Sequence, residues 1–409
     1  MNLDSIILFD TEENDRFYPF SVLHPVWELR VGAKRIFEKY QSKYPDFNIS
    51  FACANEDKLN SFLKRFNIKN TITSGAYNLV LSSQLILDET LHYEIGQIVF
   101  ENKNYLIKLK GQTVGIFTNE YINFNNIKCL DDADIRYEVY NLPDNIKYLN
   151  YIWDAIPENS EAIKEDSYFF SEMSLADYST YEGVYLVDKK NILISEKAII
   201  KPNVVIDATN GPVIIDEGVT IMSGATILGP CYIGKNSTIK VGAKIYQDTS
   251  IGEVCKVGGE VEGSIIQSYS NKQHDGFLGH SFLSEWVNLG ADTNTSDLKN
   301  TYSEIKVIQR DEEIATGTMF LGLICGDHTK SAINTQFNTG TIAGVCGILV
   351  RPGFLSNHIK SFSWGGLHSS PTYKLNKAVE VCKIVMARRN KDITEEEIRL
   401  LTSEHDKVK

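Results

Sequence analysis

Residues 215–261 repeat every six residues and read IDEGVT IMSGAT ILGPCY IGKNST IKVGAK IYQDTS IGEVCK VGGEV. Each six begins with an aliphatic residue, from Ile215 to Val257, and carries a small or short residue four places later. An α-helix repeats about every 3.6 residues and a strand every two, so neither element produces this period. A period of six is typical of a parallel β-helix, in which three short strands form one triangular coil. We therefore predict a left-handed parallel β-helix with these aliphatic residues pointing inward.

The predicted coils extend over residues 184–360. Their regularity fails between about 263 and 320, which indicates segments that loop out of the stack or distort it. The phase of six returns near Ile324, Ile342 and Ile348. Loops that project from a regular solenoid commonly carry binding residues, so we expect the functional residues in or beside the irregular part.

Residues 1–180 have a different pattern. Apolar runs that are typical of strands alternate there with segments of helical spacing, the former at 5–10, 47–54 and 78–82 and the latter at 32–44 and 56–66. Such alternation predicts an α/β domain with a parallel sheet and crossover connections. A hairpin is expected around residues 110–112, and a linking helix at about 151–165.

Residues 370–405 are expected to form C-terminal helices. Ser370 is a possible N-cap followed by Pro371 at the first helical position, and Leu375 begins an apolar stripe that continues to Met386. Thr394 and Glu397 have the spacing of a capping box for a second helix. We expect the stripe to pack on the coils or on a neighbouring subunit.

Composition excludes several classes of protein. The 409 residues predict two or three domains, and 43% hydrophobic with 23% charged residues is typical of a folded globular protein. No apolar run approaches the length of a membrane span, and the N-terminal apolar run resembles a first strand rather than a signal peptide. A net charge of −12 argues against nucleic-acid binding. The seven cysteines form no CxxC pair, which favours reduced thiols and a cytoplasmic protein.

An α/β domain followed by hexapeptide coils resembles the bifunctional uridylyltransferase/acetyltransferase that makes UDP-N-acetylglucosamine, and in particular a divergent bacterial branch of that family. The strongest motif lies at 274–291, HDGFLGHSFLSEWVNLGA. The family carries a histidine, an aromatic residue three places later, a glycine, and then Val-Asn-(Ile/Leu)-Gly-Ala at a fixed distance. Here His274, Phe277, Gly279 and residues 287–291 occupy that register without gaps.

Acyl transfer from a thioester to a sugar amine requires a base, an oxyanion donor and a means of holding two substrates together. A histidine suits the role of base near neutral pH, and the resemblance makes His274 the candidate, with His280 as a second. Backbone N–H groups around Gly290 and Ala291 are implied as oxyanion donors. Substrate contacts are implied for Phe277, Asn288, Gly290, Ala291, Asn294, Asp297, Lys299 and Asn300.

The co-substrate implied by the resemblance is acetyl-CoA or another acyl-CoA. Its nucleotide and phosphates would be held by residues of the later coils and the C-terminal segment, namely His328, Asn334, Trp364, Arg388 and Arg389. The remaining partners implied are a sugar phosphate and a nucleotide, and the resemblance predicts a homotrimer with acyl sites near the subunit interface.

The N-terminal half departs from the family, whose first strand is followed by a glycine-rich GxGTR loop that cradles phosphates. No glycine precedes Gly32 in this chain. Arg16, with Arg30 or Lys34, remains to bind phosphate, and Asp10 or Asp88 to replace the absent metal-binding aspartate. Since nucleotidyl transfer requires a divalent ion, Mg²⁺ is expected only if this domain is active, and we predict weak or absent pyrophosphate release.

Two other functions remain open at this stage. A metal lyase of the γ-carbonic anhydrase type also combines hexapeptide coils with histidines, but it needs three histidines in one site. A scaffold or sugar-nucleotide sensor would bind its ligand without turnover. No metal site is assigned from the sequence.

Overall fold

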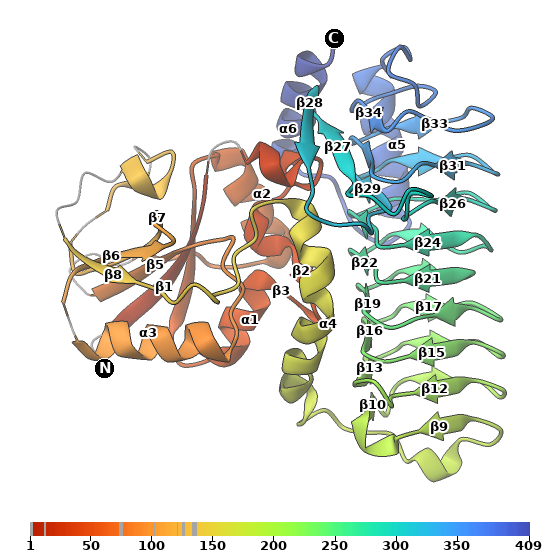
Figure 1. Cartoon of the computed structure of the whole chain (residues 1–409), viewed down its shortest axis with the longest axis horizontal. Coiled ribbons are helices and arrows are strands. Elements are labelled where there is room, and N and C mark those ends of the chain that lie inside the picture. The colour runs from red at the N-terminus through yellow and green to blue at the C-terminus, as the bar shows by residue number, and fades with distance from the viewer. Residues whose placement is uncertain are drawn as a thin grey trace.

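The computed structural model describes residues 3–11, 14–72, 77–101, 103–120, 122–124, 127–132 and 137–409. An α/β domain and a tall column of coils stand side by side, with the C-terminal helices beside the last coils (Figure 1). The predicted fold class is confirmed. Among the described residues, no helix has the length and apolar character that crossing a membrane requires.

The N-terminal domain is built on a six-stranded sheet in the order β4-β1-β5-β7-β6-β8. Its strands are β1 (Leu3–Asp10), β4 (Asn48–Cys53), β5 (Tyr77–Ser82), β6 (Tyr105–Leu109), β7 (Gln112–Thr118) and β8 (Glu138–Asn141). The helices are α1 (Ile36–Lys43), α2 (Glu56–Phe66) and α3 (Glu89–Glu101). Strands β4, β1 and β5 are parallel as predicted, but the sheet is mixed, because the predicted hairpin at residue 110 makes β7 antiparallel to β5 and β6.

The β-helix has three faces. The domain-facing sheet contains β10 (Ile192–Ile194), β13 (Val213–Ile215), β16 (Cys231–Ile233), β19 (Thr249–Ile251), β22 (Ile265–Ile266), β25 (Phe282–Leu283), β29 (Leu323–Cys325), β32 (Thr341–Ala343) and β34 (His358–Ile359). The groove-facing sheet contains β11 (Ile199–Ile200), β14 (Thr220–Ile221), β17 (Thr238–Ile239), β20 (Lys256–Val257) and β23 (Asn271–Lys272), continued by β30 (Lys330–Ser331) and β33 (Ile348–Leu349).

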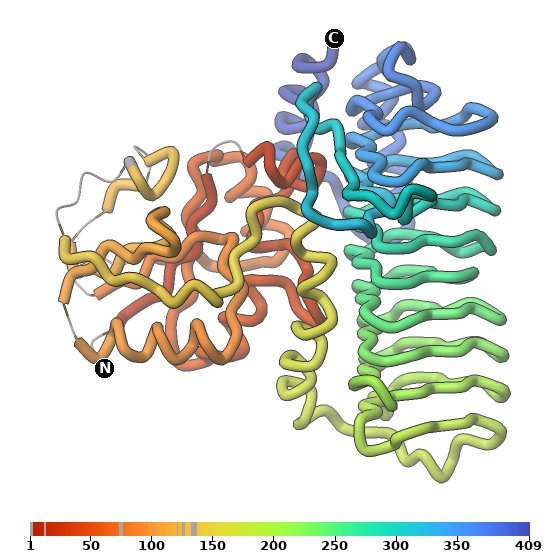
Figure 2. Tube along the Cα trace, in the orientation of Figure 1, coloured from red at the N-terminus to blue at the C-terminus, as the bar shows by residue number. Residues whose placement is uncertain are grey.

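The third face, the outer sheet, contains β9 (Tyr185–Val187), β12 (Val205–Asp207), β15 (Thr226–Leu228), β18 (Lys244–Ile245), β21 (Glu260–Glu262) and β24 (Phe277–Gly279), with β26 (Asn294–Thr295) and β31 (Gln336–Phe337) on the later coils. The aliphatic residues that begin each six, from Ile215 to Val257, are buried in one core inside the column, as predicted. Figure 2 shows the regular stacking of the coils.

Two expectations about the coils are wrong in detail. The coils continue through 263–295, and the segment that loops out, with the hairpin β27 (Lys306–Gln309) and β28 (Glu312–Ala315), lies between β26 and β29. The inward residues of β29 and β32 are Leu323, Cys325 and Ala343, whereas Ile324 and Ile342 point outward. These two isoleucines are nevertheless buried, because the N-terminal domain covers them.

The C-terminal helices are α5 (Leu375–Ala387) and α6 (Glu395–Lys407). The capping box of Thr394 and Glu397 is present as predicted, but Ser370 and Pro371 lie in the loop before α5 rather than at its start. Helix α6 returns to the N-terminal domain and packs against α2. The apolar stripe of α5 buries Ala378, Cys382 and Met386.

The linking helix lies where the sequence predicts it, as a short 3₁₀ turn followed by α4 (Ala155–Asp166). It runs beside β16 and β19 of the domain-facing sheet (Figure 1). Asn159 joins three elements, since its amide donates to the carbonyl of Asp248 and its oxygen accepts from the backbone of Gly32 and the hydroxyl of Ser250. The helix therefore fixes the first domain to the coils as well as connecting them.

The domain interface is apolar along the outward residues of the domain-facing sheet. Strand residues alternate between its two sides, so each inward residue has an outward neighbour that the other domain must cover. These neighbours are almost fully buried at Tyr232, Ile265, Phe282, Ile324 and Ile342. The interface is thus continuous with the core of the N-terminal domain.

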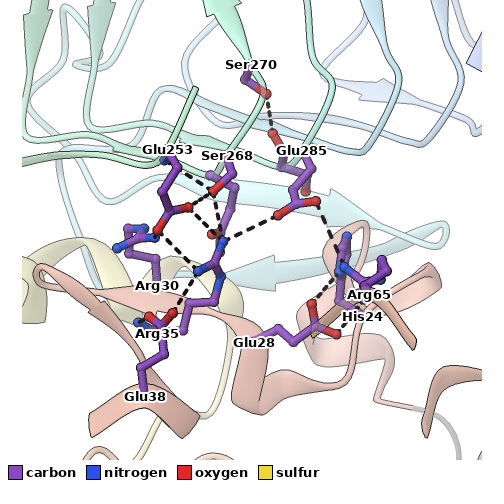
Figure 3. A network of polar contacts seen from close by, with 12 residues as sticks. His24, Glu28, Arg30, Arg35, Glu38, Arg65, Glu253, Ser268, Ser270 and Glu285 are labelled. Carbon is purple, nitrogen blue, oxygen red and sulfur yellow. Dashed lines mark hydrogen bonds and ion pairs between the residues drawn. The ribbon is translucent and has the colours of Figure 1, made fainter. Parts of the chain in front are cut away.

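A network of buried charges crosses the same interface (Figure 3). The Arg30 and Arg35 guanidinium groups both bind the Glu253 carboxylate, at 2.7 and 2.9 Å. Both arginines are buried, and these cations lower the pKa of Glu253 although burial alone would raise it. The paired arrangement satisfies charges that would otherwise be costly to bury.

His24 extends the network from the N-terminal segment to the later coils. Its ring nitrogens contact Glu28 at 3.1 Å and Asp327 at 2.8 Å. Burial alone would lower the pKa of His24, but the two carboxylates raise it to about 10. The stabilisation from charged His24 is therefore complete below its unfolded pKa of about 6.5 and is lost as the pH rises towards 10.

We predict that Glu253→Gln will destabilise the protein strongly, because it leaves the buried Arg30 guanidinium group without a carboxylate partner among the described residues and removes one of the partners of Arg35, which keeps Glu38 at 2.9 Å. Breaking a buried pair in this way costs about 3–5 kcal/mol of unfolding free energy, which thermal and denaturant unfolding will measure. Glu217→Gln, on the exposed surface of the same coils, is the matched control and should have little effect. Equal stability of the two variants would show that the network does not hold the domains together.

Candidate functional site

A groove of about 310 Å³ lies between the groove-facing sheet and the end of α5. Its floor is one column of the sheet, in which Lys256, Asn271, Asn288 and Lys330 pair in register on successive coils. The remaining lining residues are Tyr269, Gln273, Trp286, Val385, Arg388 and Arg389. Four of the lining residues carry positive charge and none carries negative charge, so the groove suits an anionic ligand.

The alternation of side chains along a strand explains why this column is polar. Val257 and Leu289 point into the coil, so the residues before them, Lys256 and Asn288, point outward. The side-chain oxygen of Asn271 is buried and makes no hydrogen bond within the described part of the chain. The groove thus contains both positive charge and an unused acceptor.

Aromatic rings form the edge of the groove at the corner nearest the N-terminal domain. Tyr269 and Trp286 stack with ring centroids 4.3 Å apart, and His328 continues the stack at 6.1 Å from Trp286. The same two rings, Tyr269 and Trp286, line a second cavity of about 230 Å³, towards Arg35 and Arg65. A ligand longer than the groove could therefore extend past the aromatic pair.

The opposite corner of the groove carries His274, Ala291 and Asn334 on successive coils. His274 is exposed and follows the groove residue Gln273, and its side chain makes no hydrogen bond or ion pair with another described residue. The backbone of Asn334 donates to the carbonyl of Ala291. The structure thus brings the predicted base, one predicted oxyanion donor and one predicted cofactor residue to one corner of the β-helix beside the groove, although none of the three lines it.

Lys272 stabilises the backbone at this corner. It was not predicted from the sequence. Its ammonium group is buried and donates to the backbone carbonyls of Gly258 and His274, at 3.1 and 2.8 Å. Burial lowers the pKa of Lys272 to about 8. The charge holds the backbone of His274 in place without contacting its ring.

The predicted oxyanion donors differ from each other. The N–H of Gly290 donates to the hydroxyl of Ser331 at 3.0 Å, so it is occupied. The N–H of Ala291 makes no hydrogen bond to another described residue. Ala291 is therefore the available donor of the pair.

His280 lies at a different corner, between the outer and domain-facing sheets. Its Nδ1 atom lies 2.8 Å from the Asp297 carboxylate, and its ring lies 5.0 Å from that of Phe320. A histidine held by a carboxylate is the arrangement in which the second ring nitrogen is oriented for proton transfer. Asp297 and Phe320 both belong to the segment that loops out, so this pair depends on that insertion.

The other predicted substrate residues are on the outer sheet or in the insertion. Asn294 accepts a hydrogen bond from the backbone of Phe277 on the preceding coil, which gives it a structural contact. Lys299 is half-buried in the insertion, where its ammonium group donates to the carbonyl of Glu304. Asn300 is exposed beside it. The side chains of Phe277, Asn294, Lys299 and Asn300 do not line the groove.

The predicted cofactor residues converge in part. Arg388 and Arg389 line the groove, whereas Trp364 stands higher in the same column, nearly half exposed and packed on Tyr373. His328 is buried beside Cys382 of α5, and its Nδ1 atom makes no hydrogen bond within the described chain. Cys346 and Cys382 of α5 are both buried and belong to the same core cluster.

His274, His280 and His328 occupy three different corners of the β-helix. A zinc site of the γ-carbonic anhydrase type needs three imidazoles around one ion. In the part of the chain that the structure describes, these three histidines do not form such a cluster. The metal-lyase alternative therefore has no support from the geometry.

The residues predicted to bind nucleotide in the first domain do not converge. Arg30 is buried and bound to Glu253, and its ring contact with Tyr232 is across the domain interface. Lys34 lies over the rings of Phe169 and Phe170 in a separate cavity of about 590 Å³. Arg16 is exposed elsewhere, above Tyr151.

The segment after β1, where the resembling family has its phosphate loop, is packed into the domain interface. Tyr18 contacts the hydroxyl of Ser361, and the ring of Phe20 meets that of Phe282 edge-on at 5.7 Å. Most side chains over 17–31 are buried. A buried apolar segment offers few free backbone N–H groups to a triphosphate.

Asp10 does not fit the requirements of a Mg²⁺ ligand. It is buried, and its two oxygens accept hydrogen bonds from the backbone of Val26 and the hydroxyl of Ser83. Burial raises the pKa of Asp10. Asp88, the second candidate, caps α3 by accepting from the backbone of Leu91, so the two carboxylates hold separate local structures rather than one ion.

The sequence analysis missed Lys256, Asn271 and Lys330 in the groove. A signal was present for Lys256, because it directly precedes the inward residue Val257 of the regular coils. Asn271 precedes Lys272, which is not aliphatic and lies where the period of six fails, so its place in the column did not follow from the pattern. Lys330 follows the insertion, so its place in the column depended on the length that loops out. Arg388 and Arg389 were identified, but only the packing of α5 places them over the column.

Comparison with known proteins agrees with this architecture. Residues 6–174 match the family model described as sugar nucleotidyl transferase, and residues 212–247 match bacterial transferase hexapeptide (six repeats). The chain is 31% identical over 293 residues to the bifunctional protein GlmU of Methanococcus aeolicus, which covers 68% of this chain and 66% of the relative.

Two further relatives match over a shorter length. The bifunctional sugar-1-phosphate nucleotidylyltransferase/acetyltransferase of Sulfurisphaera tokodaii is 34% identical over 149 residues, 36% of this chain and 37% of the relative. The bifunctional protein GlmU of Methanocaldococcus jannaschii is 34% identical over 166 residues, 39% of this chain and 38% of the relative. The chain therefore spans about two thirds of the length of the Methanococcus protein and less than two fifths of the other two.

The fold and these matches define a transferase with a sugar nucleotidyl transferase domain joined to hexapeptide coils. The chain thus combines a sugar nucleotidyl transferase domain with hexapeptide repeats, and it is similar to proteins that are named as bifunctional nucleotidyltransferase/acetyltransferases and as GlmU. The resemblance that the motif at 274–291 indicated is thereby confirmed.

Proposed function

We propose that the β-helix domain transfers an acyl group from acyl-CoA to the amine of an amino-sugar-1-phosphate, and that the first domain has lost or altered nucleotidyl transfer. The observation that carries the proposal is the positively charged groove, which lies beside the corner of His274. A binding protein without turnover would need the groove but not the histidine. A catalytic role for His274 therefore distinguishes an acyltransferase from a binding protein.

The groove has the features that a phosphorylated nucleotide requires. Lys256, Lys330, Arg388 and Arg389 supply positive charge for phosphates, and arginine in particular forms paired hydrogen bonds with phosphate oxygens. The adjacent aromatic pair offers a face for stacking with a base. The cavity beyond the pair provides room for the rest of a molecule as long as coenzyme A.

In the proposed reaction the amine attacks the thioester carbonyl while His274 removes its proton. The carbon–sulfur bond then breaks, and the proton passes to the departing thiolate, which leaves as free coenzyme A. The N–H of Ala291 is the proposed donor to the oxyanion. Lys272 acts as a positioning residue, because it holds the backbone of His274.

The pair of His280 and Asp297 is the second candidate base. It has the better orientation, since a carboxylate holds one ring nitrogen, but it lies across the outer sheet from the groove. We assign it a supporting role in the substrate region that the insertion forms. Phe277, the aromatic residue of the motif, lies on the strand between the two histidines.

A trimer would complete the site. Exposed apolar side chains line the same corner as His274, with Val241 66%, Ile333 70% and Val350 50% exposed. Covering such an edge is a common reason for cyclic association. We therefore propose a homotrimer with one acyl site near each interface, and sedimentation of a monomer at micromolar concentration would contradict it.

We predict that His274→Ala will lower the rate of thiol release from acetyl-CoA in the presence of glucosamine-1-phosphate by about 10²-fold or more, the usual contribution of a positioned base. His280→Ala should cost less, and thermal unfolding should show both variants folded. A severe loss in His280→Ala with a silent His274→Ala would transfer the role of base to the second pair.

Arg388→Ala and Arg389→Ala should raise the KM for acetyl-CoA with a smaller effect on kcat, because these side chains are proposed to hold phosphates away from the reacting carbon. Lys383→Ala, on the exposed side of α5, is the control and should leave both constants unchanged. An unchanged KM in both arginine variants would place coenzyme A outside the groove.

A further inference from the structure

Three potential metal ligands meet near the end of the β-helix, and none of them lines the groove. Asp311 is in the turn of the β27–β28 hairpin, His358 begins β34, and His368 is in the loop before α5. One ligand atom from each lies within 4.8 Å of the other two. The looped-out insertion, the last coil and the C-terminal segment thus contribute one residue each.

His358 provides an independent indication that a ligand belongs here. Its side chain is only 7% exposed, and its Nδ1 atom lies 3.4 Å from an oxygen of Asp311 but makes no hydrogen bond within the described chain. A buried ring nitrogen without a partner is costly unless another group satisfies it.

The donor set selects the kind of ion. Two imidazoles and one carboxylate suit Zn²⁺ and related transition metals, whereas Mg²⁺ and Ca²⁺ prefer oxygen ligands. Ligands at zinc distances of about 2.0–2.1 Å stand roughly 3.4 Å apart around a tetrahedron. Asp311 and His368 are exposed, so their side chains can close the remaining gap by rotation.

We propose that Asp311, His358 and His368 bind one divalent transition-metal ion of the Zn²⁺ class, which fastens the insertion hairpin to the last coil. A fourth position remains for water, because two of the three ligands face solvent. The hairpin is also held through Arg310, which pairs with Asp15 of the first domain and Glu404 of α6. The ion would therefore strengthen a junction of the N-terminal domain, the coils and the C-terminal helices.

The test is metal titration of the full-length protein after removal of metals with a chelator. We expect one Co²⁺ per chain with the visible absorption of a tetrahedral site, displaced by Zn²⁺. His368→Ala and Asp311→Asn, both at exposed positions, should each weaken binding by at least about tenfold. His92→Ala, a partly exposed histidine in the first domain, is the control and should bind like the wild type.

A second readout follows the hairpin itself. Trypsin cuts after lysine and arginine, and Lys306 and Arg310 lie in the hairpin. Zn²⁺ should slow cleavage there in the wild type and in His92→Ala but not in His368→Ala. Stoichiometric binding that both ligand variants leave unchanged, or no binding at micromolar Co²⁺ and Zn²⁺, would overturn the site, and equal cleavage with and without bound ion would overturn the fastening of the hairpin.

Discussion

Burial of Arg30 and Arg35 against Glu253 is the contact on which the arrangement of the whole molecule depends. Two cations and a carboxylate from different domains are tolerable inside the protein only when they meet, so the charges fix one relative position of the domains. The apolar outward residues of the domain-facing sheet provide most of the buried contact area, and the buried charges determine how the two domains are aligned. His24 and Asp327 extend the same principle to the later coils.

This contact also constrains function. The segment that follows β1 contains His24, Arg30 and the rings of Tyr18 and Phe20, all of which are committed to the coils. A segment used in this way cannot also close around a triphosphate without breaking the interface. The same buried packing leaves the groove-facing sheet free, where α5 and the stacked rings of Tyr269 and Trp286 form the positively charged groove.

The regular coils were predictable from the sequence because their interior repeats with a fixed period, and every sixth residue from Ile215 to Val257 lies in the same core inside the column. At Ile324 and Ile342 the sequence predicted inward residues, but these two point outward. The N-terminal domain buries them, so both sides of their strands are apolar and the pattern does not show which side is inward. Helix α5 begins later than Ser370 and Pro371 suggested, because that loop is held to the last coil by the backbone pairing of Ser363 with Thr372.

The candidate site was predictable from the sequence only in part. His274, Ala291 and Asn288 followed from one motif, whereas Lys256, Lys330 and the buried Lys272 required the stacking of coils to be known. Arg30 was expected to bind phosphate because it and Arg16 are the only lysine or arginine residues in the segment that replaces the phosphate loop. Its partner, Glu253, lies on a distant coil, and only the fold brings the two together.

The most direct test of this account is incubation of the full-length protein with acetyl-CoA, glucosamine-1-phosphate, UTP or dTTP, and Mg²⁺, with free thiol and pyrophosphate measured separately in the same samples. Since the groove and its histidine corner are intact while the segment after β1 is buried in the interface, thiol should be released and pyrophosphate should stay near background. Robust pyrophosphate release, with or without thiol, would show that the first domain binds a triphosphate and metal despite that packing, and would contradict the account.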